Sequence, residues 1–396
     1  MQKERLWTKS YILLILGNLF TFMSFQMLIP TLPPYIKSIG ASAFEVGLIT
    51  ALFSIGAVLI RPFIGFLLAY KARKMLVLLG AIALFAITLL YPLTNIIVIL
   101  LAFRLIHGIA WGWSTTANGT ASVDLIPNSR LGEGTGFYGL SITLGMIIAP
   151  SLGLILYEKV SFDLLVYISA IFGVIAIILL SIVRYQLPDA VAKTTRKELK
   201  FSFVNTLVEK SCWFPALLTL LVAFGYGSIV SFIVIFANDR GIENIFIFYL
   251  VNAIFATLSR PITGKLFDKN GPRKIVLVCS LLAFAALWVL SFSHNSFHIG
   301  IAGALLGIGY GSLLPILQSW GLFVTPPARR GIANGMNFSA IDLGIGLSGL
   351  IFGALATYWE ISTIFQISSF FILLVFFLVI LSPKSKQRLK SQKVAS

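Results

Sequence analysis

The chain has 396 residues, of which 58% are hydrophobic and only 11% charged, and its formal net charge at pH 7 is +16. A soluble globular domain has about 45–50% apolar and about 25% charged residues, so this composition excludes an ordinary soluble protein. The long apolar runs and the 33 phenylalanines indicate that lipid is the solvent for most of the chain.

Twelve continuously apolar runs of membrane-spanning length follow one another along the chain. A bilayer core about 30 Å thick needs roughly 20 apolar residues per helix, and a helix satisfies its own backbone hydrogen bonds in lipid. A β-barrel would need alternating apolar residues instead. We expect helices near 11–31, 44–66, 75–92, 95–117, 132–156, 162–183, 211–237, 245–262, 275–293, 299–322, 332–356 and 362–382.

The two halves of the chain carry related sequences 199 residues apart. LIRPFIGF at 59–66 corresponds to LSRPITGK at 258–265. Homologous halves are typical of secondary transporters whose halves move against each other. We expect an N-terminal six-helix bundle at 1–184, a cytoplasmic linker at 185–210 and a C-terminal six-helix bundle with a basic tail at 211–396. Four further pairs keep the same offset: Pro127 and Pro326, Arg130 and Arg329, Gly136 and Gly335, and Gly145 and Gly344.

The basic residues are unevenly divided between alternate loops. With the N-terminus in the cytoplasm, the inner segments hold 24 Lys and Arg, and the outer segments hold only Lys37, Lys159 and Arg240. This asymmetry follows the positive-inside rule, so we expect both termini in the cytoplasm of a bacterial-type plasma membrane. The net charge therefore does not predict nucleic-acid binding, and the basic tail is expected to lie against anionic lipid.

Signatures of enzymes and metal sites are missing from the sequence. The only histidines are His107, His294 and His298, and HExxH, GxSxG and GxxxxGK[ST] do not occur. Cys212 and Cys279 are isolated, so neither a disulfide framework nor a metal site is indicated. We expect no enzyme activity, no cofactor and no metal.

The loops after the second and eighth apolar runs share the pattern GxxxDxxGxRK. An Asp at a helix end can meet the N-terminal dipole of a neighbouring helix, and basic residues hold the loop at the cytoplasmic face. We expect such a loop to latch one conformation. The second copy is complete, with Gly264, Asp268, Gly271, Arg273 and Lys274, whereas the first keeps Gly65, Arg73 and Lys74 and has Ala69 and Ala72 in place of Asp and Gly.

The run 95–117 contains RxxxG, with Arg104 and Gly108. Arg104 lies about nine residues into its helix, near 13 Å deep at about 1.5 Å per residue. A charge at such a depth costs about 2.5–3.5 kcal/mol, so it needs a reason to be there. Its counterpart in the second half is Gly303, so the fold itself does not require it. His107, one turn later, could relay protons; the alternatives are a structural pairing of Arg104 with a helix end and plain packing of His107.

The run 132–156 combines small residues with a proline. Gly136, Gly145, Pro150 and Gly153 follow the spacing GxxxxxxxxGxxxGPxxGG, with Ala149 and Leu154 at two of its glycines. Small residues let helices approach closely, and a proline lets a helix bend.

Together these three motifs resemble those of the major facilitator superfamily, and the resemblance covers essentially the whole chain. The glycine pattern in 132–156 resembles the motif of the family's proton-driven exporters. The resemblance implies an all-α membrane protein with twelve transmembrane helices in two pseudo-symmetric six-helix bundles. It also implies a secondary active transporter that works by alternating access, with Arg104 in proton coupling or substrate binding.

Asp342 is the one acid well inside a predicted helix, about ten residues or roughly 15 Å from the cytoplasmic face. An exporter driven by protons needs an acid in the membrane that loads and releases a proton. We therefore predict that Asp342 couples protons, together with Arg104 and His107. The alternative is a structural acid that bonds to a neighbouring backbone or pairs permanently with Arg104.

In the resembled fold, the first, fourth, seventh and tenth helices line a central cavity. An aromatic and amide lining suits amphipathic organic molecules, cationic ones included, through apolar burial and cation–π contact. Helix packing is the alternative, and we expect it for about half of these residues. Arg61 and Arg260, each followed by a proline, are expected to snorkel to the cytoplasmic interface. The implied lining residues are Asn18, Phe22, Phe25, Gln26, Trp111, Trp113, Tyr226, Tyr310 and Gln318.

The function predicted from the sequence is proton-coupled efflux, or antiport, of small amphipathic organic molecules. The first alternative is a proton symporter or facilitator that imports a sugar or another small metabolite, against which the pattern in 132–156 argues. A channel or lipid scramblase is the second. Because one chain contains both halves, we expect a monomer whose partners are its substrate, protons and membrane lipid.

Overall fold

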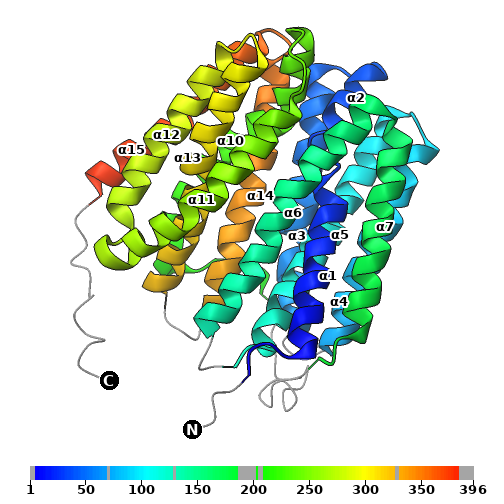
Figure 1. The fold of residues 1–396 in the computed structure, drawn as a ribbon, viewed down its shortest axis with the longest axis vertical. Helices are drawn as coiled ribbons and strands as arrows, with labels where there is room; N and C mark the ends of the chain where they lie inside the picture. Colours follow the sequence, from blue (N-terminus) through cyan, green and yellow to red (C-terminus); the bar gives the residue numbers. More distant parts are fainter. Residues whose placement is uncertain are drawn as a thin grey trace.

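The computed structural model describes residues 5–68, 72–127, 131–185, 202–203, 208–325 and 330–382, and within these ranges the fold is all-α, with no β-strand (Figure 1). The long helices of the first half are α1 (Lys9–Gln26), α3 (Ala43–Leu68), α4 (Arg73–Leu90), α5 (Ile97–Asp124), α6 (Leu131–Lys159) and α7 (Phe162–Ile182). Those of the second half are α10 (Trp213–Asp239), α11 (Phe246–Asn270), α12 (Pro272–Ser291), α13 (Ser296–Val324), α14 (Arg330–Leu355) and α15 (Ile361–Leu381). Short helices are α2 (Leu32–Ser38), η1 (Tyr91–Leu93) and η4 (Lys210–Cys212).

Eleven of the long helices in the described ranges are long and apolar enough to cross a membrane. The twelfth, α1, has 18 residues and packs against α6 and α7. The first predicted helix, 11–31, ends early, at Gln26, because Pro30 cannot continue the hydrogen-bond ladder, and α2 starts beyond the predicted range with a proline in its first turn. The predicted twelve-helix membrane fold is otherwise confirmed.

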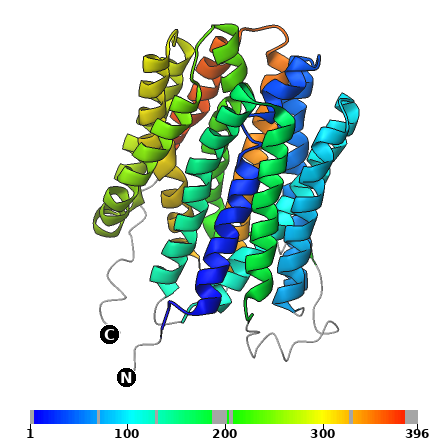
Figure 2. The same ribbon diagram turned by 45° about the vertical axis from the view of Figure 1, so that its right-hand side comes forward.

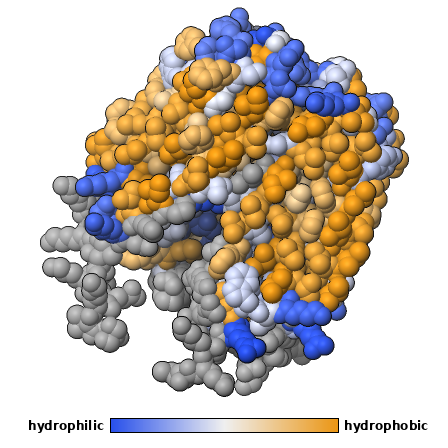
Figure 3. Space-filling model, viewed as in Figure 1, coloured by the Kyte–Doolittle hydropathy of each residue, from blue (hydrophilic) through white to orange (hydrophobic). Residues whose placement is uncertain are grey.

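On the face shown in Figure 3, hydrophobic side chains form a broad band, and hydrophilic ones gather at its two ends. Large apolar residues of the long helices, such as Leu59, Phe63 and Phe370, are about half exposed. Exposure of this kind would be costly in water but is favourable against lipid tails. The band therefore marks the part of the surface that lies in the bilayer.

Successive long helices run in alternating directions, so their ends gather at two faces (Figure 2). At the face where α1 begins, here called the terminal face, the Arg184 amide donates to Ser10 Oγ at 3.3 Å. At the opposite face, Tyr35 Oη donates to Asn95 Oδ1 at 2.8 Å. Of the expected linker and basic tail, residues 186–201, 204–207 and 383–396 lie outside the described residues.

The helices pack mainly within their own half, and the two halves meet chiefly along two crossings, α3 with α14 and α6 with α11, with smaller contacts of α10 to α2 and α3. The second-half helices lean away from the first half toward the terminal face (Figure 1). Near the opposite face, by contrast, α3 and α14 touch through their backbones. A Cβ on Gly47 would overlap the carbonyl oxygen of Gly349 and lie 2.7 Å from the Cα of Gly353. Glycine is needed there because any side chain would push the helices apart.

Gly47→Ala should force α3 and α14 apart at the opposite face, because the added methyl group meets backbone atoms that cannot rotate away. We expect a longer and broader distance distribution between spin labels at Ser38 and Glu243, which lie in different halves near that face. Double electron–electron resonance measures this distance. Gly139→Ala is the control, since a Cβ there meets nothing within 4 Å. A wild-type distance and melting temperature in Gly47→Ala would contradict the packing described.

Candidate functional site

A buried ion pair joins the two halves where α3 crosses α14. Nη2 and Nε of Arg61 lie 2.6 Å and 3.0 Å from Oδ2 of Asp342. The two side chains are only 7% and 12% exposed. Asp342 is about 18 Å along α14 from its first residue, at about 1.5 Å per residue. The pair therefore lies deep in the membrane-spanning region, at the boundary between the halves.

Arg61 also bonds within its own half. Its Nη1 donates to the hydroxyls of Thr115 and Thr116 on α5, at 3.2 Å and 3.3 Å. Each hydroxyl in turn donates to a backbone carbonyl one turn earlier, so its oxygen is free to accept from the guanidinium. Arg61 is thus anchored to α5 independently of Asp342.

Two expectations from the sequence are wrong at this crossing. Arg61 does not snorkel to the interface, because its guanidinium is buried against an acid of the other half. The alternative that Asp342 pairs with Arg104 also fails, because its ion-pair partner is Arg61. The proline after Arg61 lies inside α3 and does not mark the end of the helix.

Arg104 lies instead in an aromatic enclosure within the first half. Its Cζ is 4.6 Å from the ring centroid of Phe53 and 5.7 Å from that of Phe25. The side chain is buried, and its Nε and Nη1 have no hydrogen-bond partner among the described residues. A desolvated cation–π contact contributes about 2 kcal/mol or more, so the rings replace part of the solvation that burial removes.

His107 lies one turn from Arg104 and is fully buried. Its Nδ1 is 3.1 Å from the hydroxyl of Tyr91 in η1, and its Nε2 has no partner among the described residues. The three residues predicted for proton coupling therefore form two separate groups, Asp342 between the halves and Arg104 with His107 inside one half. Over the described ranges, no three His, Cys, Asp or Glu side chains gather as a metal site would require.

The predicted cavity residues of the first half divide into two kinds. Phe22, Phe25 and Trp111 form one aromatic cluster, in which Trp111 stacks on Phe25 with centroids 4.0 Å apart and meets Phe22 edge-on at 4.8 Å. Asn18 and Trp113 serve packing instead. Asn18 donates to Ser141 at 3.0 Å, and Trp113 donates from Nε1 to the Leu76 carbonyl at 2.9 Å. Gln26 is buried at the end of α1.

The predicted cavity residues of the second half contact one another or a neighbouring helix. The rings of Tyr226 on α10 and Tyr310 on α13 stack with centroids 3.9 Å apart. Gln318 donates from Nε2 to Oδ1 of Asn334 on α14 at 2.6 Å. The aromatic residues thus form one group in each half, Phe22, Phe25 and Trp111 in the first and Tyr226 and Tyr310 in the second.

In the incomplete first copy of the loop motif, the acid that pairs with the motif arginine comes from another helix. Arg73, at the start of α4, contacts Asp124 at the end of α5, with Nε and Oδ2 2.6 Å apart, and also donates to the Leu68 carbonyl. Gly65 lies in α3 and Lys74 is exposed. Asp124 was not predicted from the sequence, although an acid just after the second run that follows an unpaired motif arginine was the available signal.

The second copy ties α12 to α15. Arg273 donates from Nη2 to the Ile380 carbonyl at 2.8 Å and from Nη1 to the Ser382 carbonyl at 3.1 Å. Gly271 has a φ of 73°, which favours glycine, whereas Ala72 in the first copy has a φ of −61° and tolerates a side chain. Gly264 and Asp268 lie in α11, and the Asp268 side chain is outside the described part of the structure.

The small residues of α6 let α1 pack closely against it. A Cβ on Gly145 would lie 2.6 Å from the Cβ of Phe22, and one on Gly153 would lie 2.6 Å from the Met27 carbonyl oxygen. Pro150 lies inside α6, and Gly136 belongs to the same helix. In the described residues, this motif therefore acts in helix packing within the first half, next to the aromatic cluster.

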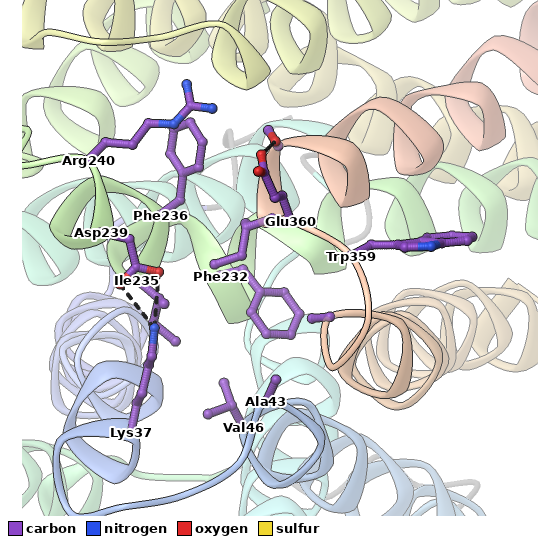
Figure 4. Close-up of a pocket in the computed structure, with 13 residues that line it drawn as sticks. Lys37, Ala43, Val46, Phe232, Ile235, Phe236, Asp239, Arg240, Trp359 and Glu360 are labelled. Atoms are coloured by element: carbon purple, nitrogen blue, oxygen red, sulfur yellow. Dashed lines mark hydrogen bonds and ion pairs between the residues drawn. The ribbon is translucent and has the colours of Figure 1, made fainter.

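A pocket of about 410 Å³ lies between the halves at the opposite face (Figure 4). Lys37 reaches across it, with Nζ 3.1 Å from both carboxylate oxygens of Asp239. Both side chains are about half exposed, so this pair contributes about 0–1 kcal/mol. Other lining residues are Ala43, Val46, Phe232, Phe236, Arg240, Trp359 and Glu360.

Asp342→Asn and Arg61→Gln should each lower the melting temperature of the purified protein, because each leaves a buried partner unmatched, at a cost of about 3–5 kcal/mol. The double variant should lose clearly less than the sum of the two losses. Thermal unfolding in detergent, followed by tryptophan fluorescence, measures the single and double variants of this double-mutant cycle. The exposed pair Lys37→Gln and Asp239→Asn is the control, with additive losses below about 1 kcal/mol. Additive losses at Arg61 and Asp342 would mean that the two side chains do not interact.

Comparison with known proteins relates this arrangement to one family. The family model of the Major Facilitator Superfamily matches residues 14–274 and 247–395. Multidrug resistance protein MdtG of Serratia proteamaculans (strain 568) is 25% identical over 362 residues, covering 88% of this chain and 87% of the relative. Quinolone resistance protein NorA of Staphylococcus aureus (strain COL) is 24% identical over 343 residues, covering 85% and 88%. The crystal structure of the nucleoside transporter NupG has a TM-score of 0.72 at 14% identity, covering 94% of this chain and 98% of its own.

Proposed function

This chain belongs to the major facilitator superfamily of membrane transporters, and we propose that it exports small amphipathic organic molecules in exchange for protons by alternating access. It is a multi-pass membrane transporter and not an enzyme. Two observations support export as the direction. Relatives that align over most of the chain carry names of multidrug and quinolone resistance, and the glycine and proline pattern of α6 resembles that of the family's exporters, with Ala149 and Leu154 at two of its glycines.

The proposal depends chiefly on the ion pair between Arg61 and Asp342. With Asp342 ionised, two charge-assisted hydrogen bonds hold α3 to α14. A proton on Asp342 removes its negative charge and so most of its attraction for the guanidinium. Proton binding thereby weakens a contact between the halves, which is what coupling of protons to alternating access requires.

The threonines on α5 can keep Arg61 hydrogen-bonded when Asp342 is protonated. Because Thr115 and Thr116 belong to the same half as Arg61, the guanidinium remains in that half as the halves separate. It can then meet Asp342 again once the proton leaves. Arg61 acts here as a positioning residue, and Asp342 carries the proton.

Arg104 and His107 are proposed as a second element of coupling. The His107 Nε2 has no partner among the described residues, so it is available to a proton or a water molecule. Arg104 adds a positive charge on the same helix face, which opposes a lasting positive charge on His107. Protons would therefore pass this site without being held.

We place the terminal face in the cytoplasm of a plasma membrane, as the distribution of basic residues predicts. The pair of Lys37 with Asp239 and the contact of Gly47 with Gly349 then lie on the outside. The described contacts accordingly support an outward-closed arrangement. Substrate would enter between the halves from the cytoplasm and meet the two aromatic groups, and the protein would work as a monomer in contact with lipid.

The test is proton movement in liposomes that contain the purified protein and a trapped pH dye. An imposed gradient of an amphipathic organic molecule should drive protons in the opposite direction. Asp342→Asn should reduce this proton flux at least tenfold, because an amide cannot load a proton. It should still exchange labelled for unlabelled substrate. Asp163→Asn is the matched control, since Asp163 is an exposed acid at the start of α7 and should leave the flux unchanged.

Proton flux in the same direction as the substrate would overturn export and indicate a symporter. Substrate movement without proton flux would indicate a facilitator. Full proton coupling in Asp342→Asn would overturn the assignment of the coupling acid.

A further inference from the structure

The two crossings between the halves are built from equivalent residues. Adding the repeat offset of 199 to Arg61 gives Arg260, and subtracting it from Asp342 gives Thr143. Arg61 contacts Asp342 where α3 crosses α14, and Arg260 donates from Nη1 to the Thr143 hydroxyl where α11 crosses α6. The duplication has therefore placed the same arginine contact on both sides of the molecule.

The two contacts differ in charge. Asp342 brings a carboxylate to Arg61, whereas Thr143 offers Arg260 only a neutral hydroxyl. Among the described residues the ion pairs are Lys37 with Asp239, Arg61 with Asp342 and Arg73 with Asp124. Arg260 belongs to none of them, and its buried Nε has no hydrogen-bond partner in the described structure.

The depth of Arg260 makes this lack of an anion costly. Arg260 is ten residues before the end of α11, which is about 15 Å along the helix axis. It is four residues before the end of the candidate membrane span Phe246–Gly264, about 6 Å along the axis. Asp268 is eight residues further along α11, about 12 Å along the axis. A guanidinium buried inside the span costs several kcal/mol unless an anion is near it.

Arg260 is also open to a ligand. It remains partly exposed, and it lies at the boundary between the halves, where α11 crosses α6. A guanidinium has five N–H donors in a planar fork, of which Thr143 engages one. The remaining donors match the two oxygens of a carboxylate.

We propose that Arg260 binds the anionic group of the transported molecule, and that the substrates are amphipathic organic carboxylates. This inference rests on the proposed transport function and names the class of its substrates. It replaces the cationic molecules that the aromatic lining suggested, because the fixed charge at the boundary between the halves is positive. In one crossing the protein supplies the carboxylate, and in the other the substrate delivers it.

Direct binding to the purified full-length protein in detergent tests the inference without any proton gradient. The probes are 1-naphthylacetate with its neutral amide and its ammonium analogue 2-(1-naphthyl)ethylamine, and octanoate with octanamide. Isothermal titration calorimetry should give each carboxylate at least tenfold tighter binding than its amide. Arg260→Gln should remove this preference.

Thr143→Asp is the sharper variant, because it supplies Arg260 with the acid that Arg61 already has. It should abolish the carboxylate preference while Arg260 is still present. Thr143→Asn is the matched control of the same size without the charge. Its loss of carboxylate preference should be at least tenfold smaller than that of Thr143→Asp. A folded Thr143→Asp also guards against the possibility that Arg260→Gln fails to fold.

The inference is overturned if neither carboxylate binds more tightly than its amide, or if Thr143→Asp binds like Thr143→Asn. The inferred anion site and the proposed antiport can each be overturned without the other. Carboxylate-selective binding without proton exchange in liposomes would overturn antiport alone. Proton-coupled export of cations without carboxylate binding would overturn the anion site alone.

Discussion

A guanidinium buried within the membrane-spanning region needs an anion close to it, and this requirement organises the contact between the two halves. At the crossing of α3 and α14, Asp342 supplies that anion to Arg61. At the crossing of α6 and α11, Thr143 stands in the same place and leaves the charge of Arg260 unmatched. Both positions lie where the halves meet. A change of charge at either one therefore acts directly on the force between the halves, whether a proton or a ligand brings it.

Much of the fold could be predicted from the sequence, because lipid leaves the backbone few choices. Continuous apolar runs have to form helices, and the repeat offset shows that the second half follows the plan of the first. The one clear difference in a helix comes from local chemistry. Pro30 ends the first predicted helix early, and α2 follows as a separate element. That break was visible in the sequence, but hydropathy alone does not register it.

The partners of the polar residues could not be predicted in the same way. Arg61 and Asp342 are 281 residues apart, and only the packing of α3 on α14 brings them together. A proline after an arginine is compatible with a helix end and with a helix interior. The Arg-Pro pair therefore did not show whether Arg61 reaches the membrane interface or is buried between helices. Likewise, Trp111 and Trp113 are two residues apart on α5, and one joins the aromatic cluster while the other faces α4. Two such residues are about 200° apart around the helix axis, and only the packing of α5 shows which of them faces the cluster.

The shared offset of the arginine contacts has a consequence for how such a protein arises. A symmetric homodimer of one six-helix unit would repeat every substitution in both subunits, so both crossings would carry an acid or neither would. Fusion of two copies into one gene lets each position change once. A single chain can then keep Asp at position 342 and Thr at position 143. Its two crossings can therefore have different tasks, whereas a symmetric ancestor would have had to perform both tasks at identical crossings.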